Sequence, residues 1–124
     1  MSGAKTEKES RMKELLNLPA SARLETMGHR RYIGGADAET WYGIGLLQFQ
    51  LLVSQGLRPE HVFLDIACGS LRLGQYLIPY LEPDKYLGLE AEPDLVAAGL
   101  KSELRFGLEA SKRPRFGVAS HQMV

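Results

Sequence analysis

The sequence reads FLDIACGSLRLG from Phe63 to Gly74 and YLGLE from Tyr86 to Glu90. The first stretch is an apolar run that ends in a turn of small residues, and the second is an apolar run that ends in a carboxylate. A small-residue turn after one strand and an acidic residue at the end of the next are how doubly wound α/β domains hold an adenosine-bearing ligand. These two segments therefore predict an α/β fold with a ligand site at the ends of its strands.

From residue 61 onward, strand patterns alternate with helix patterns. We expect strands over 61–67 and 85–91 and the start of a third over 113–119, with helices over 72–81 and 93–108 between them. The first strand is almost continuously apolar, which is typical of a parallel strand covered on both faces. The turn Ala67–Ser70 leads into a helix expected to begin near Leu71. The predicted fold class is therefore α/β, a Rossmann-like doubly wound parallel sheet of about three strands, incomplete, with a helical lead-in.

The lead-in is a helix expected from Glu39 to Gln55, because apolar residues recur there at three- and four-residue spacing. Gly56 stands where a C-terminal cap belongs. Further upstream, residues 5–18 have the pattern of a short surface helix, and residues 20–38 read as a connecting loop. We divide the chain into an N-terminal helix and arm (1–31) and one α/β domain (32–124).

Composition favours an ordinary soluble domain. The 124 residues allow one core of modest size, and 44% apolar with 24% charged residues are globular values. No apolar run approaches the roughly 18 residues of a membrane-spanning helix, and the N-terminus lacks the apolar region of a signal peptide. Cys68 is the single cysteine. We therefore predict a cytoplasmic location without membrane contact.

The charges are unevenly distributed although they sum to zero. Residues 1–31 carry seven basic and four acidic side chains, residues 32–100 three and nine, and residues 101–124 five and two. An acidic middle does not suit a phosphate-rich partner, so nucleic-acid binding is not favoured.

The turn and the two carboxylates carry the candidate chemistry. Small side chains at Ala67, Gly69 and Ser70 allow backbone amides to approach a ligand, although a tight turn without a ligand would look the same. Glu90 is placed to accept hydrogen bonds from ribose hydroxyls, or it is an ordinary solvated acid. Asp65 ends an apolar run and must find donors, so it either orients the turn or receives a ligand ammonium.

Two nucleotide-binding motifs can be rejected. A dinucleotide Gly-x-Gly-x-x-Gly fails because Arg72 stands where the third glycine belongs. A phosphate loop fails because, after Gly69 and Gly74, Gln75 replaces the lysine and Tyr76 the hydroxyl residue.

Three further residue types are candidates for chemistry. The scattered histidines His29, His61 and His121 do not predict a metal site. Cys68 is either a nucleophile or, more commonly for such a residue, a small buried side chain. Arg72 either closes over a ligand carboxylate or simply begins a helix.

The run DIACGSLRLG followed by YLGLE resembles the class I S-adenosylmethionine-dependent methyltransferases, in particular a subgroup whose first loop reads Cys-Gly-x-Leu-Arg-x-Gly. The upstream segment RRYIGGADAETWYGIGLLQFQLLVSQGLRPE is similar to that subgroup's helical lead-in, so the likeness covers about residues 30–118. The chain departs from the wider family at Ala67 and Leu71, where glycines are usual. Leu71 is expected within the subgroup.

The resemblance implies S-adenosylmethionine as cofactor and assigns a set of site residues. Asp65, Ala67, Gly69 and Ser70 would line the methionine part, Glu90 the ribose and Ala91 the adenine, with Cys68 and Arg72 completing the loop. It names neither catalytic residues nor the methyl acceptor.

The resemblance also implies that residues 32–124 are the N-terminal half of a methyltransferase domain, because the family continues to a fourth strand. We expect methyl transfer only if the domain is completed. One alternative is a non-catalytic interaction module that pairs its open sheet edge with a completing chain or a second copy. Another is an adenosine-nucleotide binder that prefers ATP or NAD.

Overall fold

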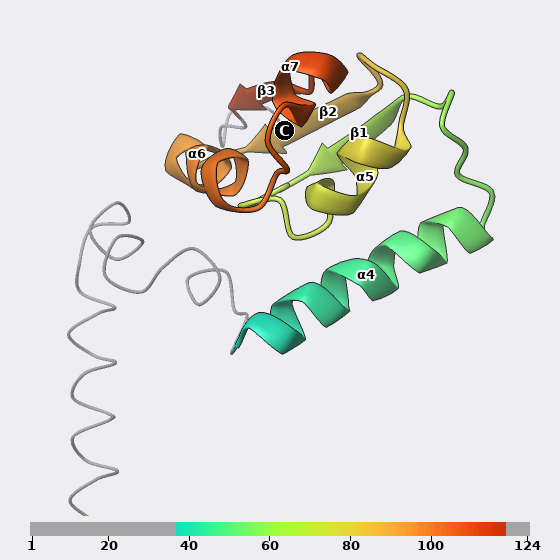
Figure 1. The fold of residues 1–124 in the computed structure, drawn as a ribbon, viewed down its shortest axis with the longest axis horizontal. Coiled ribbons are helices and arrows are strands. Elements are labelled where there is room, and N and C mark those ends of the chain that lie inside the picture. The colour runs from blue at the N-terminus through green and yellow to red at the C-terminus, as the bar shows by residue number, and fades with distance from the viewer. Residues whose placement is uncertain (1–36, 119–124) are drawn as a thin grey trace, which may run out of the picture.

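A computed structural model describes residues 37–118 as a parallel sheet with helices packed against it (Figure 1). In chain order the elements are α4 (Ala38–Ser54), β1 (Phe63–Ile66), α5 (Gly74–Tyr80), β2 (Tyr86–Glu90), α6 (Pro93–Ser102), α7 (Leu108–Lys112) and β3 (Arg115–Val118). The three strands lie in the order β1-β2-β3, and both pairs are parallel. The predicted α/β class with a three-stranded parallel sheet is confirmed.

Helix α4 matches the predicted lead-in helix closely. The Asp37 carboxylate caps its first turn by accepting a hydrogen bond from the Thr40 amide at 2.7 Å. At the other end Gly56 takes a left-handed φ of 107°, and the Leu57 amide donates back to the Leu52 carbonyl. This is the glycine-terminated helix end that the sequence predicted.

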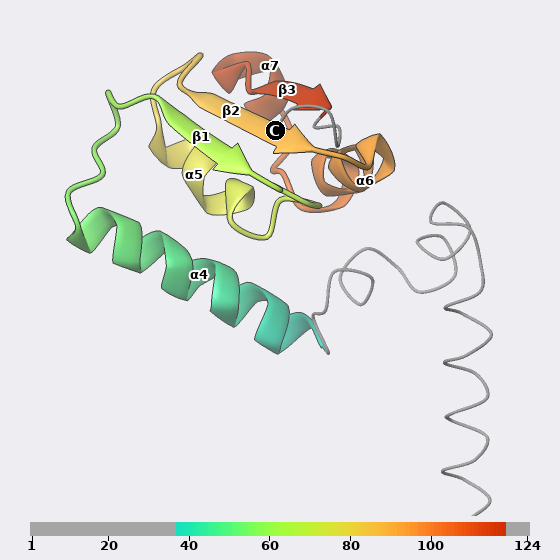
Figure 2. The same cartoon turned by 180° about the vertical axis from the view of Figure 1, so that it is seen from behind.

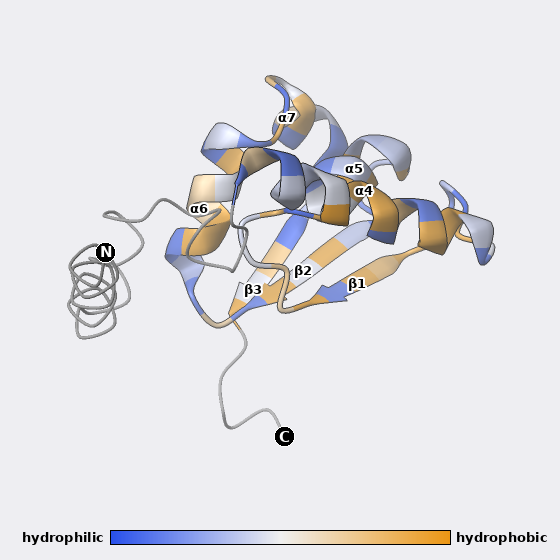
Figure 3. Cartoon of the chain, turned by 90° about the horizontal axis from the view of Figure 1, so that it is seen from below, coloured by the Kyte–Doolittle hydropathy of each residue, from blue (hydrophilic) through white to orange (hydrophobic). Residues whose placement is uncertain are grey.

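The helices lie on one side of the sheet and leave its other side uncovered among the described residues. Figures 2 and 3 show α5 behind the strands and the helices gathered above them. On β1, Phe63 and Asp65 face the helices, whereas Leu64 is 50% exposed and Ile66 is 70% exposed. The expectation of a strand covered on both faces is therefore wrong for residues 37–118. A continuous apolar run shows that a strand has two apolar faces but not that both are covered.

The core lies between the covered face of the sheet and the helices. Its buried members are Leu71, Leu77, Ile78, Leu81, Tyr86 and Leu104. Full burial of one such aliphatic side chain contributes roughly 1.5–3 kcal/mol. Three of them come from α5 or the residue after it. A helix this short is not stable on its own, so α5 is stabilised by the packing of these side chains in the core.

Two helix boundaries differ from the prediction. Helix α5 begins at Gly74 rather than near Leu71, because Leu71 has a left-handed φ of 70°. The helix predicted over 93–108 is broken into α6 and α7. The chain leaves α6 after Ser102, buries Leu104 in the core and turns at Gly107, whose φ is 86°.

The helix expected over 5–18, the arm 1–31 and most of the loop 20–38 lie outside the described residues. Within 37–118, no helix combines the length and the apolar character needed to cross a membrane.

Candidate functional site

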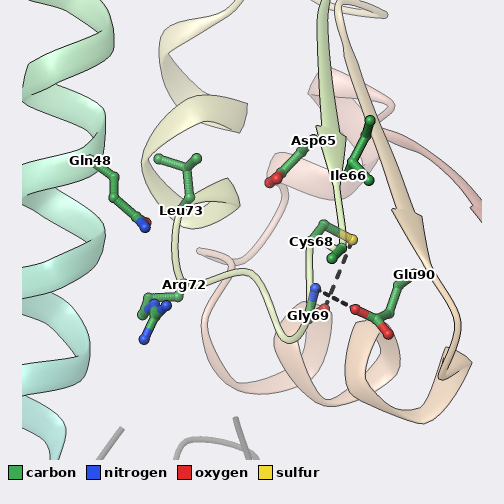
Figure 4. A pocket seen from close by; sticks show the side chains of 9 residues that line it. Gln48, Asp65, Ile66, Cys68, Gly69, Arg72, Leu73 and Glu90 are labelled. Atoms are coloured by element: carbon green, nitrogen blue, oxygen red, sulfur yellow. Dashed lines mark hydrogen bonds between the residues drawn. The ribbon is translucent and has the colours of Figure 1, made fainter. Parts of the chain in front are cut away.

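The predicted turn and the predicted acidic residue come together at the carboxyl ends of β1 and β2 (Figure 4). Ile66 pairs with Leu89 in the sheet, and the Cys68 amide donates to the Leu89 carbonyl at 3.0 Å. The loop 67–73, which we call the β1–α5 loop, therefore leaves the sheet directly beside Glu90. A cavity of about 300 Å³ opens at this point.

Most of the predicted site residues line this cavity. Those that do are Asp65, Ala67, Cys68, Gly69, Arg72 and Glu90. Ser70 and Ala91 do not belong to the lining. Ser70 is fully buried, and its carbonyl oxygen lies against Gly99 of α6, whereas Ala91 is exposed beyond the end of β2.

The β1–α5 loop alternates into the left-handed backbone region at Ala67, Gly69 and Leu71, with φ values of 59°, 58° and 70°. A non-glycine residue in this region costs roughly 1–2 kcal/mol. Leu71 is fully buried, and burial of its side chain contributes a similar or larger free energy, which offsets the cost of the left-handed backbone. Ala67 is exposed and has no such compensation.

Two glycines bring helices against the loop backbone. A Cβ atom on Gly45 of α4 would overlap the Arg72 carbonyl oxygen, and one on Gly99 of α6 would overlap the Ser70 carbonyl oxygen. The Tyr76 hydroxyl also donates to the Tyr42 carbonyl of α4 at 3.1 Å. The loop is therefore held between two helices that approach it without side chains.

Both carboxylate oxygens of Glu90 accept hydrogen bonds, one from the β1–α5 loop and the other from the chain just after β2. One accepts a hydrogen bond from the Gly69 amide at 2.9 Å, and the other accepts one from the Glu92 amide at 3.0 Å. Hydrogen bonds to a charged group are the stronger kind, roughly 1.5–3 kcal/mol each. Each oxygen keeps a further lone pair, so the same carboxylate can still accept from a ligand hydroxyl.

Asp65 is the second carboxylate of the cavity and is held by Tyr86. The Tyr86 hydroxyl donates to Asp65 at 2.7 Å. Burial raises the pKa of Asp65 above its ordinary value, the Tyr86 hydrogen bond opposes this, and the negative charge of Glu90 raises it further. Two carboxylates facing one cavity create a demand for a positive group.

Cys68 is buried and unsuited to nucleophilic chemistry. Burial, with the nearby charges of Asp65 and Glu90, raises the pKa of its thiol to about 12. Its sulfur fits only because residue 88 is glycine, since a Cβ there would lie 2.9 Å from Sγ. Of the two readings, a small buried side chain is the one that the geometry supports.

Arg72 supplies a positive group to the cavity, and Gln48 supplies a neutral polar group. Figure 4 shows Arg72 between α4 and the loop, with Gln48 reaching from α4 toward Leu73. The Arg72 guanidinium forms no ion pair within residues 37–118. The sequence did not predict Gln48, Ile66 or Leu73 as lining residues. Gly45 is the sequence feature that could have identified Gln48. It lies about one turn earlier on the same helix and marks the point where α4 contacts the loop.

Comparison with known proteins gave no matching family model and no matching curated protein. Among residues 37–118, no group of three or more histidine, cysteine or acidic side chains is placed to hold a metal ion.

Proposed function

We propose that this cavity binds S-adenosylmethionine in a Rossmann-like half of a cytoplasmic methyltransferase, which transfers a methyl group to an acceptor when completed. The observation that carries the proposal is the β1–α5 loop. It adopts left-handed backbone at three alternate positions and is joined by a hydrogen bond to the carboxylate that ends β2. Because a left-handed conformation is strained for alanine, its presence at Ala67, in the lining of the cavity and without compensating burial, supports a functional origin.

The charges of the cavity fit this cofactor. Asp65 and Glu90 outnumber Arg72, so the lining favours a ligand that is cationic overall but carries one carboxylate. S-adenosylmethionine has an ammonium, a sulfonium and a carboxylate group. ATP has several negative charges. In this cavity it would meet two carboxylates, and only one guanidinium would be present to balance its charge. The cavity chemistry therefore favours the sulfonium ligand over a nucleotide.

Each polar side chain then has a role toward the ligand. Asp65 receives the ammonium, Arg72 pairs with the carboxylate, and Glu90 accepts from the ribose hydroxyls while it holds Gly69 in place. When bound, the cofactor supplies an electrophilic methyl group. The chain holds it by positioning and charge. The protonated Cys68 thiol beside it does not compete for the methyl group.

Calorimetric titration with S-adenosylhomocysteine tests the proposal, with ATP as the comparison ligand. We expect saturable binding of S-adenosylhomocysteine and none of ATP. Glu90→Gln keeps the shape of the side chain but removes its charge, and we expect roughly 5- to 150-fold weaker binding, equivalent to 1–3 kcal/mol. Glu82→Gln is the control, because Glu82 is exposed and outside the cavity lining.

A folded sample that binds neither ligand would refute the cofactor proposal. Preferential binding of ATP would instead support the adenosine-nucleotide reading. Equal affinities of the two glutamate variants would remove Glu90 from the site.

One observation favours a second candidate, an interaction module. Within residues 37–118, β1 pairs only with β2, and Leu64 and Ile66 are exposed on the uncovered face of the sheet. An unpaired edge beside an apolar face is a template for another strand. Sedimentation at several concentrations tests this. A monomer at all concentrations would count against pairing between copies, and self-association lost in Ile66→Lys would support it.

A further inference from the structure

A second, wider cavity of about 690 Å³ lies between α6 and α7. Its lining includes Leu100 and Lys101 from α6, Arg105 and Phe106 from the connecting turn, and Ala110 from α7. We call it the α6–α7 groove. It shares no lining residue with the cavity at the β1–α5 loop. The groove is therefore a different cavity from the one proposed to bind the cofactor.

Phe106 is the most exposed large apolar side chain among the described residues, with a relative exposure of 103%. Water contact leaves the hydrophobic free energy of this side chain unused, and burial against a partner would recover it. No aromatic partner is within ring-contact distance of it in the described chain. The next residue, Gly107, has a left-handed φ of 86° and open space around it. This turn therefore holds a fully exposed aromatic residue at the lining of the groove.

The groove also carries two cations that form no ion pair within residues 37–118. Elsewhere in residues 37–118, Arg58 pairs with Glu60 and Arg113 pairs with Asp84, each at 2.7 Å. Lys101 and Arg105 form no such pair within that range, and Glu109 is the one acidic residue of the lining. The groove is therefore positive overall, and Leu100, Phe106 and Ala110 give it apolar surface beside these charges.

We propose that the α6–α7 groove docks an acidic peptide segment of a partner protein, with one apolar side chain of that segment packed against Phe106. The charge excess selects carboxylates, and the apolar lining selects an aliphatic or aromatic anchor. A concave, partly aliphatic surface suits a peptide better than a flat lipid surface. A phosphate backbone would meet Glu109 and the leucines as well as the two cations.

Amide NMR spectra of the full 124-residue chain test this with two probe peptides of equal length. One is built from glutamate and leucine, and the other from lysine and leucine. We expect the acidic peptide to shift the signals of Phe106, Gly107 and Ala110, and the basic peptide to leave them in place. Phe106→Ala and Arg105→Glu should each weaken the acidic peptide at least about tenfold, the loss typical of an interface anchor.

Arg58→Glu is the matched control, because it reverses an exposed arginine charge outside the groove and we expect unchanged affinity. Unchanged spectra away from residue 106 would show that Phe106→Ala is folded, as its full exposure leads us to expect. The proposal fails if the acidic peptide leaves the groove signals in place, or if the basic peptide shifts them equally. Phosphatidylserine vesicles that retain the parent chain but not Phe106→Ala, without any peptide effect, would overturn it in favour of a lipid surface.

Discussion

Replacing Gly45 by alanine tests whether contact of α4 with the β1–α5 loop positions the site. Gly43 lies two residues earlier on the same helix, and a Cβ there would meet no atom within 4 Å. Gly45, in contrast, would place its Cβ into the Arg72 carbonyl oxygen and 3.0 Å from the Tyr76 ring. The two substitutions add the same methyl group to the same helix, in open space at residue 43 and against the loop backbone at residue 45.

The magnitudes separate the two variants. Alanine is favoured over glycine inside a helix by about 0.8–1 kcal/mol, so Gly43→Ala should raise the free energy of unfolding by that amount. Gly45→Ala gains the same propensity but loses roughly 1–3 kcal/mol through overpacking, because a backbone carbonyl must move. We therefore expect Gly45→Ala to lie below Gly43→Ala by roughly 1–3 kcal/mol.

Urea denaturation followed by circular dichroism measures the difference. With an m value of about 1 kcal/mol per molar urea for a small chain, the midpoints should differ by about 1 M or more. Because the displaced group belongs to the loop, Gly45→Ala should also weaken binding of S-adenosylhomocysteine, whereas Gly43→Ala should not. If both variants were stabilised equally, the close docking of α4 and the positioning role of Gly45 would both be refuted.

Three further predictions concern Asp65 and the β1–α5 loop. The raised pKa of Asp65 means that its contribution to stability is fully present below the unfolded value of about 3.9 and is lost as pH rises through the folded value. Asp65→Asn, which still accepts from Tyr86, should therefore show a smaller fall in the free energy of unfolding between about pH 4 and 7; identical pH slopes for variant and parent would contradict this. Cys68, buried and with a pKa of about 12, should resist labelling by a thiol reagent at pH 7 until urea is added, and rapid labelling of the native chain would disprove its burial. Ala67→Gly should raise the free energy of unfolding by up to about 1 kcal/mol by relieving a left-handed alanine, whereas Leu71→Gly should lower it by about 2–5 kcal/mol through lost burial; calorimetric melting of both variants checks the opposite signs.

The alternation of strands and helices along the chain and the parallel direction of the strands could be predicted, because they depend on local patterns. The apolar runs at β1 and β2, separated by a helical pattern, led directly to parallel pairing. The sequence also predicted correctly that the small-residue turn lies close to Glu90, because the carboxyl ends of neighbouring parallel strands share one edge of a sheet.

The misplacements depend on long-range packing. Leu71 was expected to begin a helix because its sequence context is helical, but core burial holds it in a left-handed conformation. The resemblance assigned Ser70 to the ligand site, and the structure shows that Ser70 is fully buried with its carbonyl oxygen against Gly99 of α6. Gln48 reaches the cavity only because α4 docks at Gly45, and no local pattern describes how a helix docks.

The uncovered face of the sheet also affects the thermodynamics of unfolding. Leu64 and Ile66 are already hydrated in the folded chain, so unfolding transfers less apolar surface into water than a sheet covered on both faces would. The heat capacity of unfolding is proportional to that newly hydrated apolar area, about 0.45 cal/K/mol for each Å². The isolated chain should therefore have an unusually shallow curve of stability against temperature, and any molecule that covers this face should steepen it.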